Sequence, residues 1–246
     1  MLVVAADKAL IFKSKITLMR ILASVCLSFF LVLSFTANAQ ISIGVKAGPD
    51  FSRLVNAVQG NDGSGNISVL KSGTLTQWYG GVFVDISLDS GMGLYLRPGI
   101  DYIGTGGSMN PNALYYNPNG FQPSTKYSLH YVDLPLEFVY SPGFGWGRPW
   151  FGFGFYTGVL VNGTIKTQGG SSTPVLIGSK SDDNFQRVDF GYAFTLGLAT
   201  KVGFLFGIDY QHGLVRVVPG SSGTSLPRLQ TRNSVWGLNV GWVFKL

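Results

Sequence analysis

The residues best placed to do chemistry are charged side chains that share the polar face of alternating, strand-like segments. They are Lys46, Asp85, Arg97, Asp101, Asp133, Glu137, Asp189, Asp209 and Lys245. A charge buried without a partner is very costly, so we expect these groups to pair with one another across strands. Two interiors fit them: a plug of salt bridges and tyrosines, or a narrow charged path for ions or small solutes.

A second candidate site is catalytic. Ser128 and His130 stand two residues apart on one strand face, and barrel enzymes that deacylate lipid A use a Ser and a His on their lipid-facing side. A His activates a hydroxyl only within hydrogen-bond reach, and no acidic residue is evident on that face. His212 is isolated, which gives a metal site of two histidines little support. We expect no enzyme, no catalytic residue, no metal and no cofactor.

The segment Tyr131–Tyr140 indicates which elements must position the charges. Its sequence, YVDLPLEFVY, has apolar side chains at the even positions and Asp133 and Glu137 at the odd ones. Side chains alternate across a strand, so one face of this strand is apolar and the other is polar. Such a strand suits a closed barrel in a membrane, with lipid on its apolar face.

Seven further segments alternate in the same way. They are residues 41–48, 78–88, 94–102, 151–159, 188–198, 204–210 and 236–246, and with Tyr131–Tyr140 they make eight segments. Eight runs of about ten residues make the even strand count of a single-chain outer-membrane barrel, and none is as long as a membrane-spanning helix. We predict an all-β, eight-stranded, antiparallel up-and-down transmembrane barrel.

The connections between these segments alternate between long and short. The long ones are residues 50–77, 104–126, 162–186 and 215–233, and the short ones are residues 89–93, 141–149 and 200–203. Outer-membrane barrels have short periplasmic turns and long outer loops. The pattern therefore predicts two periplasmic termini and four outer loops, which we expect to be mobile or partly disordered because they are rich in Gly, Ser, Asn and Pro.

The first 39 residues have the features of a secretory signal. Basic residues precede an apolar run, Ile21–Phe35, which ends in Ala37-Asn38-Ala39. We predict a signal peptide over 1–39, with Met19 as an alternative start, and a barrel domain over 40–246. Without the leader's four basic residues and one acidic residue, the net charge of +6 falls to +3 (14 basic, 11 acidic), which argues against a nucleic-acid partner.

Three further expectations concern particular residue types. Aromatic side chains near strand ends are expected at the membrane–water interfaces. They are Trp78, Tyr102, Tyr127, Tyr140, Trp236 and Trp242. Pro98 and Pro135 each remove a ladder donor, so we expect a bulge or a water-satisfied neighbour at each. The inward-facing glycines should leave room for bulky inward tyrosines.

Six segments resemble one known family in register. YVDLPLEFVY, GVKAGPDFS, LRPGIDYIGTG, GFGFYTGVL, FGYAFTLGLA and IDYQHGLVRV are similar to strands of PorT-like outer-membrane β-barrel proteins of Bacteroidota-type bacteria. The resemblance implies a Gram-negative outer-membrane barrel with membrane lipid and the barrel-assembly machinery as partners. The family's namesake takes part in protein secretion. Barrels of this kind usually end in an aromatic residue, whereas this chain ends in Phe244-Lys245-Leu246.

These observations predict a non-enzymatic outer-membrane protein with a structural or surface-interaction role carried by four outer loops. The first alternative is a narrow pore, a ligand-binding barrel or a secretion-system component, and the second is an enzyme that modifies outer-membrane lipid. A soluble, lipocalin-like barrel is the structural alternative. Lipocalins keep apolar side chains inside, which is the reverse of the charge pattern here.

Overall fold

The computed structural model describes residues 41–59, 67–88, 91–109, 125–178, 183–218 and 230–245, which fold into one ten-stranded sheet. The strands are β1 (Ile41–Gln59), β2 (Ile67–Lys71), β3 (Leu75–Ser87), β4 (Leu94–Met109), β5 (Thr125–Tyr140), β6 (Gly147–Thr167), β7 (Ser172–Pro174), β8 (Val188–Thr200), β9 (Phe204–Gly213) and β10 (Gln230–Lys245). No helix in these ranges is long and apolar enough to cross a membrane.

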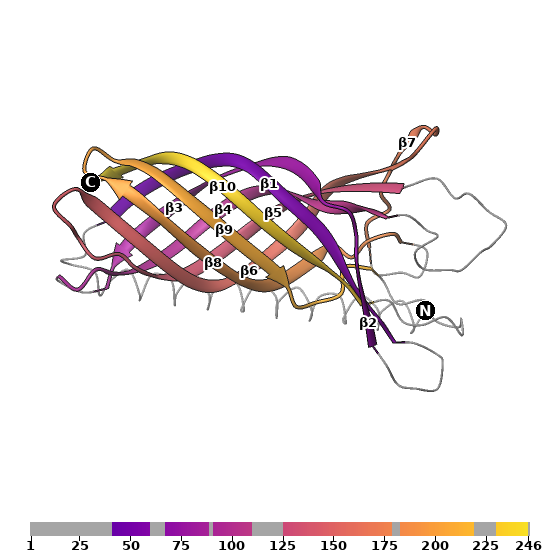
Figure 1. Cartoon of the computed structure of the whole chain (residues 1–246), viewed down its shortest axis with the longest axis horizontal. Coiled ribbons are helices and arrows are strands. Elements are labelled where there is room, and N and C mark those ends of the chain that lie inside the picture. The colour runs from indigo at the N-terminus through magenta and orange to yellow at the C-terminus, as the bar shows by residue number, and fades with distance from the viewer. Residues whose placement is uncertain are drawn as a thin grey trace, which may run out of the picture. The chain divides into compact units, whose positions relative to one another are not determined.

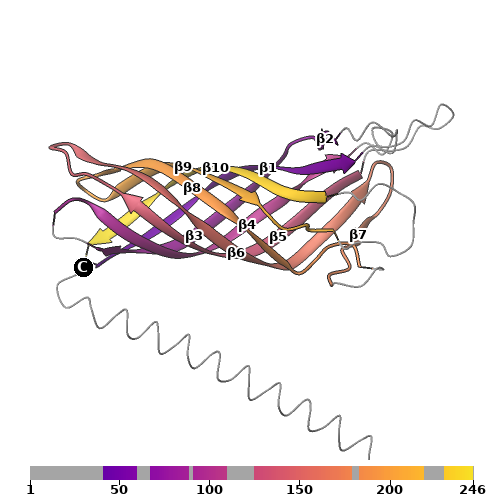
Figure 2. The ribbon, with the colours of Figure 1, turned by 90° about the horizontal axis from the view of Figure 1, so that it is seen from below.

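Eight of these strands close into a barrel. Their order is β10-β9-β8-β6-β5-β4-β3-β1, and β1 pairs again with β10 from Ser42↔Lys245 to Ala57↔Gln230. Every pairing between strands is antiparallel, and the strands run obliquely to the long axis (Figures 1 and 2). The predicted fold is therefore confirmed, and the short strands β2 and β7 are additions to β1 and β6.

The two ends of the barrel differ, and we name them by their connections. At the turn end lie the β3–β4, β5–β6 and β8–β9 connections, and β1 begins and β10 ends there. At the opposite end, which we call the loop end, lie β2 and β7 (Figure 1). Because the number of barrel strands is even, the start of β1 and the end of β10 lie at the same end of the barrel.

Side chains alternate between the two faces of the wall as predicted. On β5, Leu134 and Phe138 are 53% and 64% exposed, whereas Asp133 and Glu137 are 2% and 6% exposed. An apolar outer face and a polar inner face are typical of a transmembrane barrel. The lipocalin-like alternative, which requires the opposite arrangement, is wrong.

At the loop end the strands are longer than the sequence predicted. β1 continues to Gln59, β6 to Thr167, and β5 begins at Thr125, so parts of the predicted loops are strand. The hydrophobic alternation stops where the outer face leaves the apolar zone, but backbone pairing with neighbouring strands continues beyond that level. Periodicity therefore marks the apolar part of each strand rather than its full length.

Of the two expectations at each proline, a bulge is wrong, and a water-satisfied neighbour stays a prediction. Pro98 pairs with Leu136 and Pro135 with Tyr156, and neither β4–β5 nor β5–β6 shifts register at these residues. The single shift recorded between β5 and β6 lies between His130 and Tyr131. The long ladders on both sides hold the register, so a missing donor removes a hydrogen bond locally without adding a residue.

Inward glycines make room for inward aromatic rings. A Cβ at Gly237 would lie 2.8 Å from the Tyr79 ring, and one at Gly191 would lie 2.7 Å from the Tyr156 ring. Both distances are shorter than an ordinary van der Waals contact, so a larger residue would displace the ring. The interior is therefore filled by a few large side chains set against residues without one.

Candidate functional site

A polar layer centred on Lys46 crosses the middle of the barrel. Lys46 Nζ lies 3.1 Å from Asp101 Oδ2 and 2.9 Å from Asp209 Oδ2, and the three side chains are 13%, 4% and 14% exposed. Asp209 also accepts hydrogen bonds from Tyr79, Thr195 and Asn239. One cation from β1 thus joins carboxylates from β4 and β9, so the layer ties strands from opposite parts of the sheet.

A second ion pair lies nearer the turn end. Arg97 Nε and Nη2 donate to the two carboxylate oxygens of Asp85, at 2.6 Å and 3.1 Å. The guanidinium also lies 4.3 Å from the Phe83 ring centroid and 5.3 Å from that of Trp150. Two parallel hydrogen bonds and two aromatic faces fix this cation, which is the geometry that arginine favours.

The remaining predicted interior charges have other surroundings. Asp189 accepts hydrogen bonds from Asn233 and Tyr156, and from its neighbour's backbone N–H. Asp133 and Glu137 are buried as well, and among the described side chains no salt bridge joins either of them to a cation. The side chain of Lys245 lies outside the described residues. The structure therefore brings five of the nine predicted charges into ion pairs.

An apolar cluster closes each side of this polar layer. The loop-end cluster contains Leu54, Tyr79, Ile103, Leu129, Tyr131, Leu160, Val175, Phe185, Val217 and Val235. The turn-end cluster contains Phe83, Val139, Trp150, Ala199, Leu205 and Val243. The inward side chains of β5 pass through these layers in order. Leu129 belongs to the loop-end cluster, Asp133 and Glu137 to the polar middle, and Val139 to the turn-end cluster. An enclosed space of about 10 Å³ beside Tyr79 and Asp209 is at the lower limit of room for one water molecule.

Loop segments form part of the loop-end cluster. We call residues 175–178, 183–187 and 214–218 the lid. Val175, Phe185 and Val217 are at most 7% exposed, and backbone hydrogen bonds tie Gln186 to Val217 and Val217 to Thr231. These parts of the predicted mobile loops differ from the expectation, because apolar side chains within polar loops fold into the barrel mouth.

One interior carboxylate was missed by the sequence analysis. Asp50, assigned there to a loop, is fully buried in β1, and its Oδ2 accepts a hydrogen bond of 3.1 Å from the Gly104 backbone N–H. The signal was the alternation itself, which continues past Gly48 with Asp50, Ser52 and Leu54 on the inward side. The expected strand ends at Gly48, and Asp50 is counted as the first residue of the connection 50–77.

Ser128 and His130, the candidate catalytic pair of the enzyme alternative, do not contact each other in a catalytic arrangement. The Ser128 hydroxyl donates to Gln77 Oε1 at 2.9 Å, and the His130 ring stacks on Tyr102 at 5.6 Å between centroids. His212 lies apart on β9, beside the rings of Tyr192 and Tyr210. Across the part of the chain that the structure describes, no group of three or more His, Cys, Asp or Glu could hold a metal ion.

Five of the six predicted interface aromatics face outward. Trp78, Tyr102, Tyr140, Trp236 and Trp242 are between 39% and 74% exposed. Tyr127 differs, because its ring packs edge-on against Phe185 at 5.7 Å and belongs to the border of the loop-end cluster. The reason is parity: Tyr127 shares the inward side of β5 with Leu129 and Tyr131.

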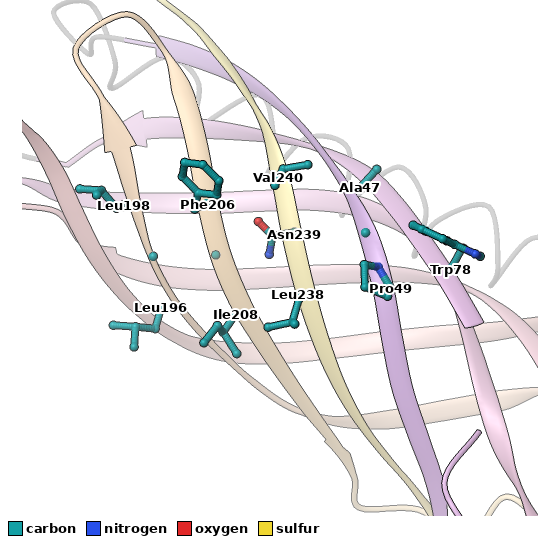
Figure 3. A pocket seen from close by; sticks show the side chains of 13 residues that line it. Ala47, Pro49, Trp78, Leu196, Leu198, Phe206, Ile208, Leu238, Asn239 and Val240 are labelled. Atoms are coloured by element: carbon teal, nitrogen blue, oxygen red, sulfur yellow. The ribbon is translucent and has the colours of Figure 1, made fainter. Parts of the chain in front are cut away.

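A hollow of about 730 Å³ lies on the outside of the wall, over β8, β9, β10 and β1 (Figure 3). Its apolar lining includes Leu196, Phe206, Leu238 and Val240, all of them exposed side chains. Because it is apolar and opens away from the barrel axis, hydrocarbon suits it and a polar solute does not.

Comparison with protein families gives one match that covers most of the chain. The model described as "Outer membrane protein beta-barrel domain" matches residues 35–217. A search of curated proteins found no match.

Solved structures of small barrels are similar to the chain at low identity. Ail of Yersinia pestis, crystallised with the heparin analogue sucrose octasulfate, is 11% identical, with 83% of this chain and 99% of that chain covered and a TM-score of 0.39. Neisserial surface protein A is 13% identical (83% and 97% covered, TM-score 0.41). OprG of Pseudomonas aeruginosa is 12% identical (85% and 98% covered, TM-score 0.40).

Proposed function

The chain belongs to the outer membrane protein beta-barrel domain family, and from this we propose that it is a non-enzymatic, closed barrel that acts at the cell surface through its loops. The observation that carries the proposal is the filled interior. Ion pairs occupy the middle layer, and apolar clusters close both sides of it. A barrel of about eight strands has an interior that side chains just fill. This barrel therefore supports a plug rather than a path for solutes.

The orientation is part of the proposal. The loop end would face outward and both termini would face the periplasm, because outer-membrane barrels keep short turns on the periplasmic side. Residues 1–39, which lie outside the described residues, would be the cleaved leader. The narrower PorT-like membership rests on the six strand motifs.

We predict that this orientation is visible on intact cells. An epitope inserted between Asn117 and Pro118, in the second long loop, should be labelled by antibody on intact cells. The same epitope after Leu246 should be labelled only after the outer membrane is permeabilised, because antibodies do not cross it. Labelling of the C-terminal epitope on intact cells would reverse the proposed orientation.

We predict that the refolded protein has no steady open state in a planar lipid bilayer. Current recordings should stay at the baseline of protein-free membrane, because the polar layer and both clusters block the lumen. A variant without residues 172–187 removes part of the lid but leaves the polar layer and the turn-end cluster. It should also remain closed. A steady conductance of the wild type would overturn the plug, and conductance of the shortened variant alone would show a gated channel instead.

A further inference from the structure

The charged side chains on the outer face of the described strands are all cations, whereas the carboxylates face inward together with Lys46 and Arg97. The strand carboxylates that the structure describes all lie on the inward side: Asp50, Asp85, Asp101, Asp133, Glu137, Asp189 and Asp209. On the outward side near the loop end stand Arg53, Lys126, Lys166 and Arg232, with Arg187 and Arg216 exposed in the adjoining loops. The outward-facing charged side chains of the described strands at this level are therefore all cationic, and they fit an anionic partner.

The arrangement of Lys126 and Lys166 is the most specific part of this surface. The two residues are direct cross-strand partners between β5 and β6, and both are exposed. Like charges directly opposite each other destabilise a sheet. The next outward pair toward the membrane, Ser128 and Thr164, is neutral. An anion between the two ammonium groups would replace this repulsion with two attractions.

The register places this pair at the level of lipid headgroups. Tyr140 and His130 both belong to the outward-facing series on β5. With a rise of ~3.3 Å per residue and a strand tilt of ~40°, they lie about 25 Å apart along the barrel axis. That is the height of the apolar band of a membrane barrel, about 25 Å. Tyr102, stacked on His130, marks its edge. Lys126 lies about 10 Å farther out by the same rise, and lysine stems can reach back along the surface.

The opposite side of the barrel repeats this order. On β10, Trp242 and Trp236 are exposed at the apolar levels, and Arg232 follows toward the loop end. On β1, Arg53 pairs with Ser234 and so stands diagonally next to Arg232. Basic side chains thus follow directly after the aromatic residues on two separate parts of the wall, as a headgroup contact requires.

We propose that the outward-facing pair Lys126 and Lys166 binds the phosphate of an anionic lipid headgroup. The two ammonium groups supply up to six N–H donors to the phosphate oxygens. The neighbouring hydroxyls of Ser128 and Thr164 stand on the membrane side of the pair, where a headgroup meets its acyl chains. The lipid's chains then lie against the apolar wall of β5 and β6. A soluble anion would lack this last contact.

The test uses the full-length mature barrel in vesicles of phosphatidylcholine, with and without an equal part of phosphatidylglycerol. The thermal unfolding midpoint, followed by tryptophan fluorescence and by the gel shift of boiled samples, should rise for the wild type when phosphatidylglycerol is present. In the double variant Lys126→Gln/Lys166→Gln, the rise in the unfolding midpoint should be less than half of the wild-type rise. In phosphatidylcholine alone this double variant should be at least as stable as the wild type, because the like-charge repulsion is gone.

Three controls separate the proposal from its alternatives. Lys126→Arg/Lys166→Arg keeps both charges and should keep the rise. Lys201→Gln removes an exposed cation at the turn end and should affect the rise less than Lys126→Gln does. Inorganic phosphate added to phosphatidylcholine vesicles should give no rise. An undiminished rise in the double glutamine variant, an equal loss with Lys201→Gln, or an equal rise with inorganic phosphate would each overturn the assignment.

Discussion

Replacing Lys46 with methionine is expected to lower the free energy of unfolding by about 3–5 kcal/mol, the usual effect of removing one partner from a buried ion pair. Methionine fills much of the same volume, so packing changes little. The loss arises because Asp101 and Asp209 then remain buried without their cation. Reversible urea unfolding of the barrel in lipid vesicles, followed by tryptophan fluorescence, measures this change.

Two variants show whether the charge is the cause. Combining Lys46→Met with Asp101→Asn and Asp209→Asn removes the uncompensated carboxylates and should recover most of the lost stability. Lys201→Met removes an exposed lysine and should change the free energy of unfolding by no more than about 0.5 kcal/mol. If Lys46→Met alone unfolds at the same urea concentration as the wild type, the polar layer does not depend on this ion pair.

Replacing Phe185 with alanine is expected to open the lid. Phe185 is 3% exposed and packs against the loop-end cluster, and truncation of a buried phenylalanine typically costs about 3–5 kcal/mol. Because the lid is a loop segment, the cost should appear as easier local opening before the barrel unfolds. Hydrogen exchange of the Gln186 and Val217 amides, which donate to Val217 and Thr231, should become much faster.

Leu176 provides the matched control for the lid. It lies in the same segment but is 57% exposed, so Leu176→Ala should change lid opening by about 0.5 kcal/mol or less. Amides in the centre of β5, such as that of Leu134, should keep their protection in both variants. Equal exchange rates in Phe185→Ala and Leu176→Ala would mean that the lid is not held by its apolar contacts.

The barrel could be predicted because a membrane wall imposes two simple rules on the sequence. Each strand must alternate apolar and polar residues, and its connections must alternate between short and long. The interior charges on Asp133, Glu137 and Asp209 followed from parity alone. Asp50 did not, because the expected strand ended at Gly48 although the alternation continues beyond it. Tyr127 did not, because its outward neighbours Lys126 and Ser128 are polar, so the two faces of that part of β5 look alike in the sequence.

The sequence by itself determined the number of strands in the closed barrel, the class of fold and the face on which most charges lie, because these depend on local periodicity and on the solvent of each face. Only the tertiary structure decided which charges meet, that Val175, Phe185 and Val217 close the mouth, and that Lys126 stands opposite Lys166. Those contacts depend on strand register and barrel closure, which bring together residues far apart in the chain, and local alternation carries no information about them.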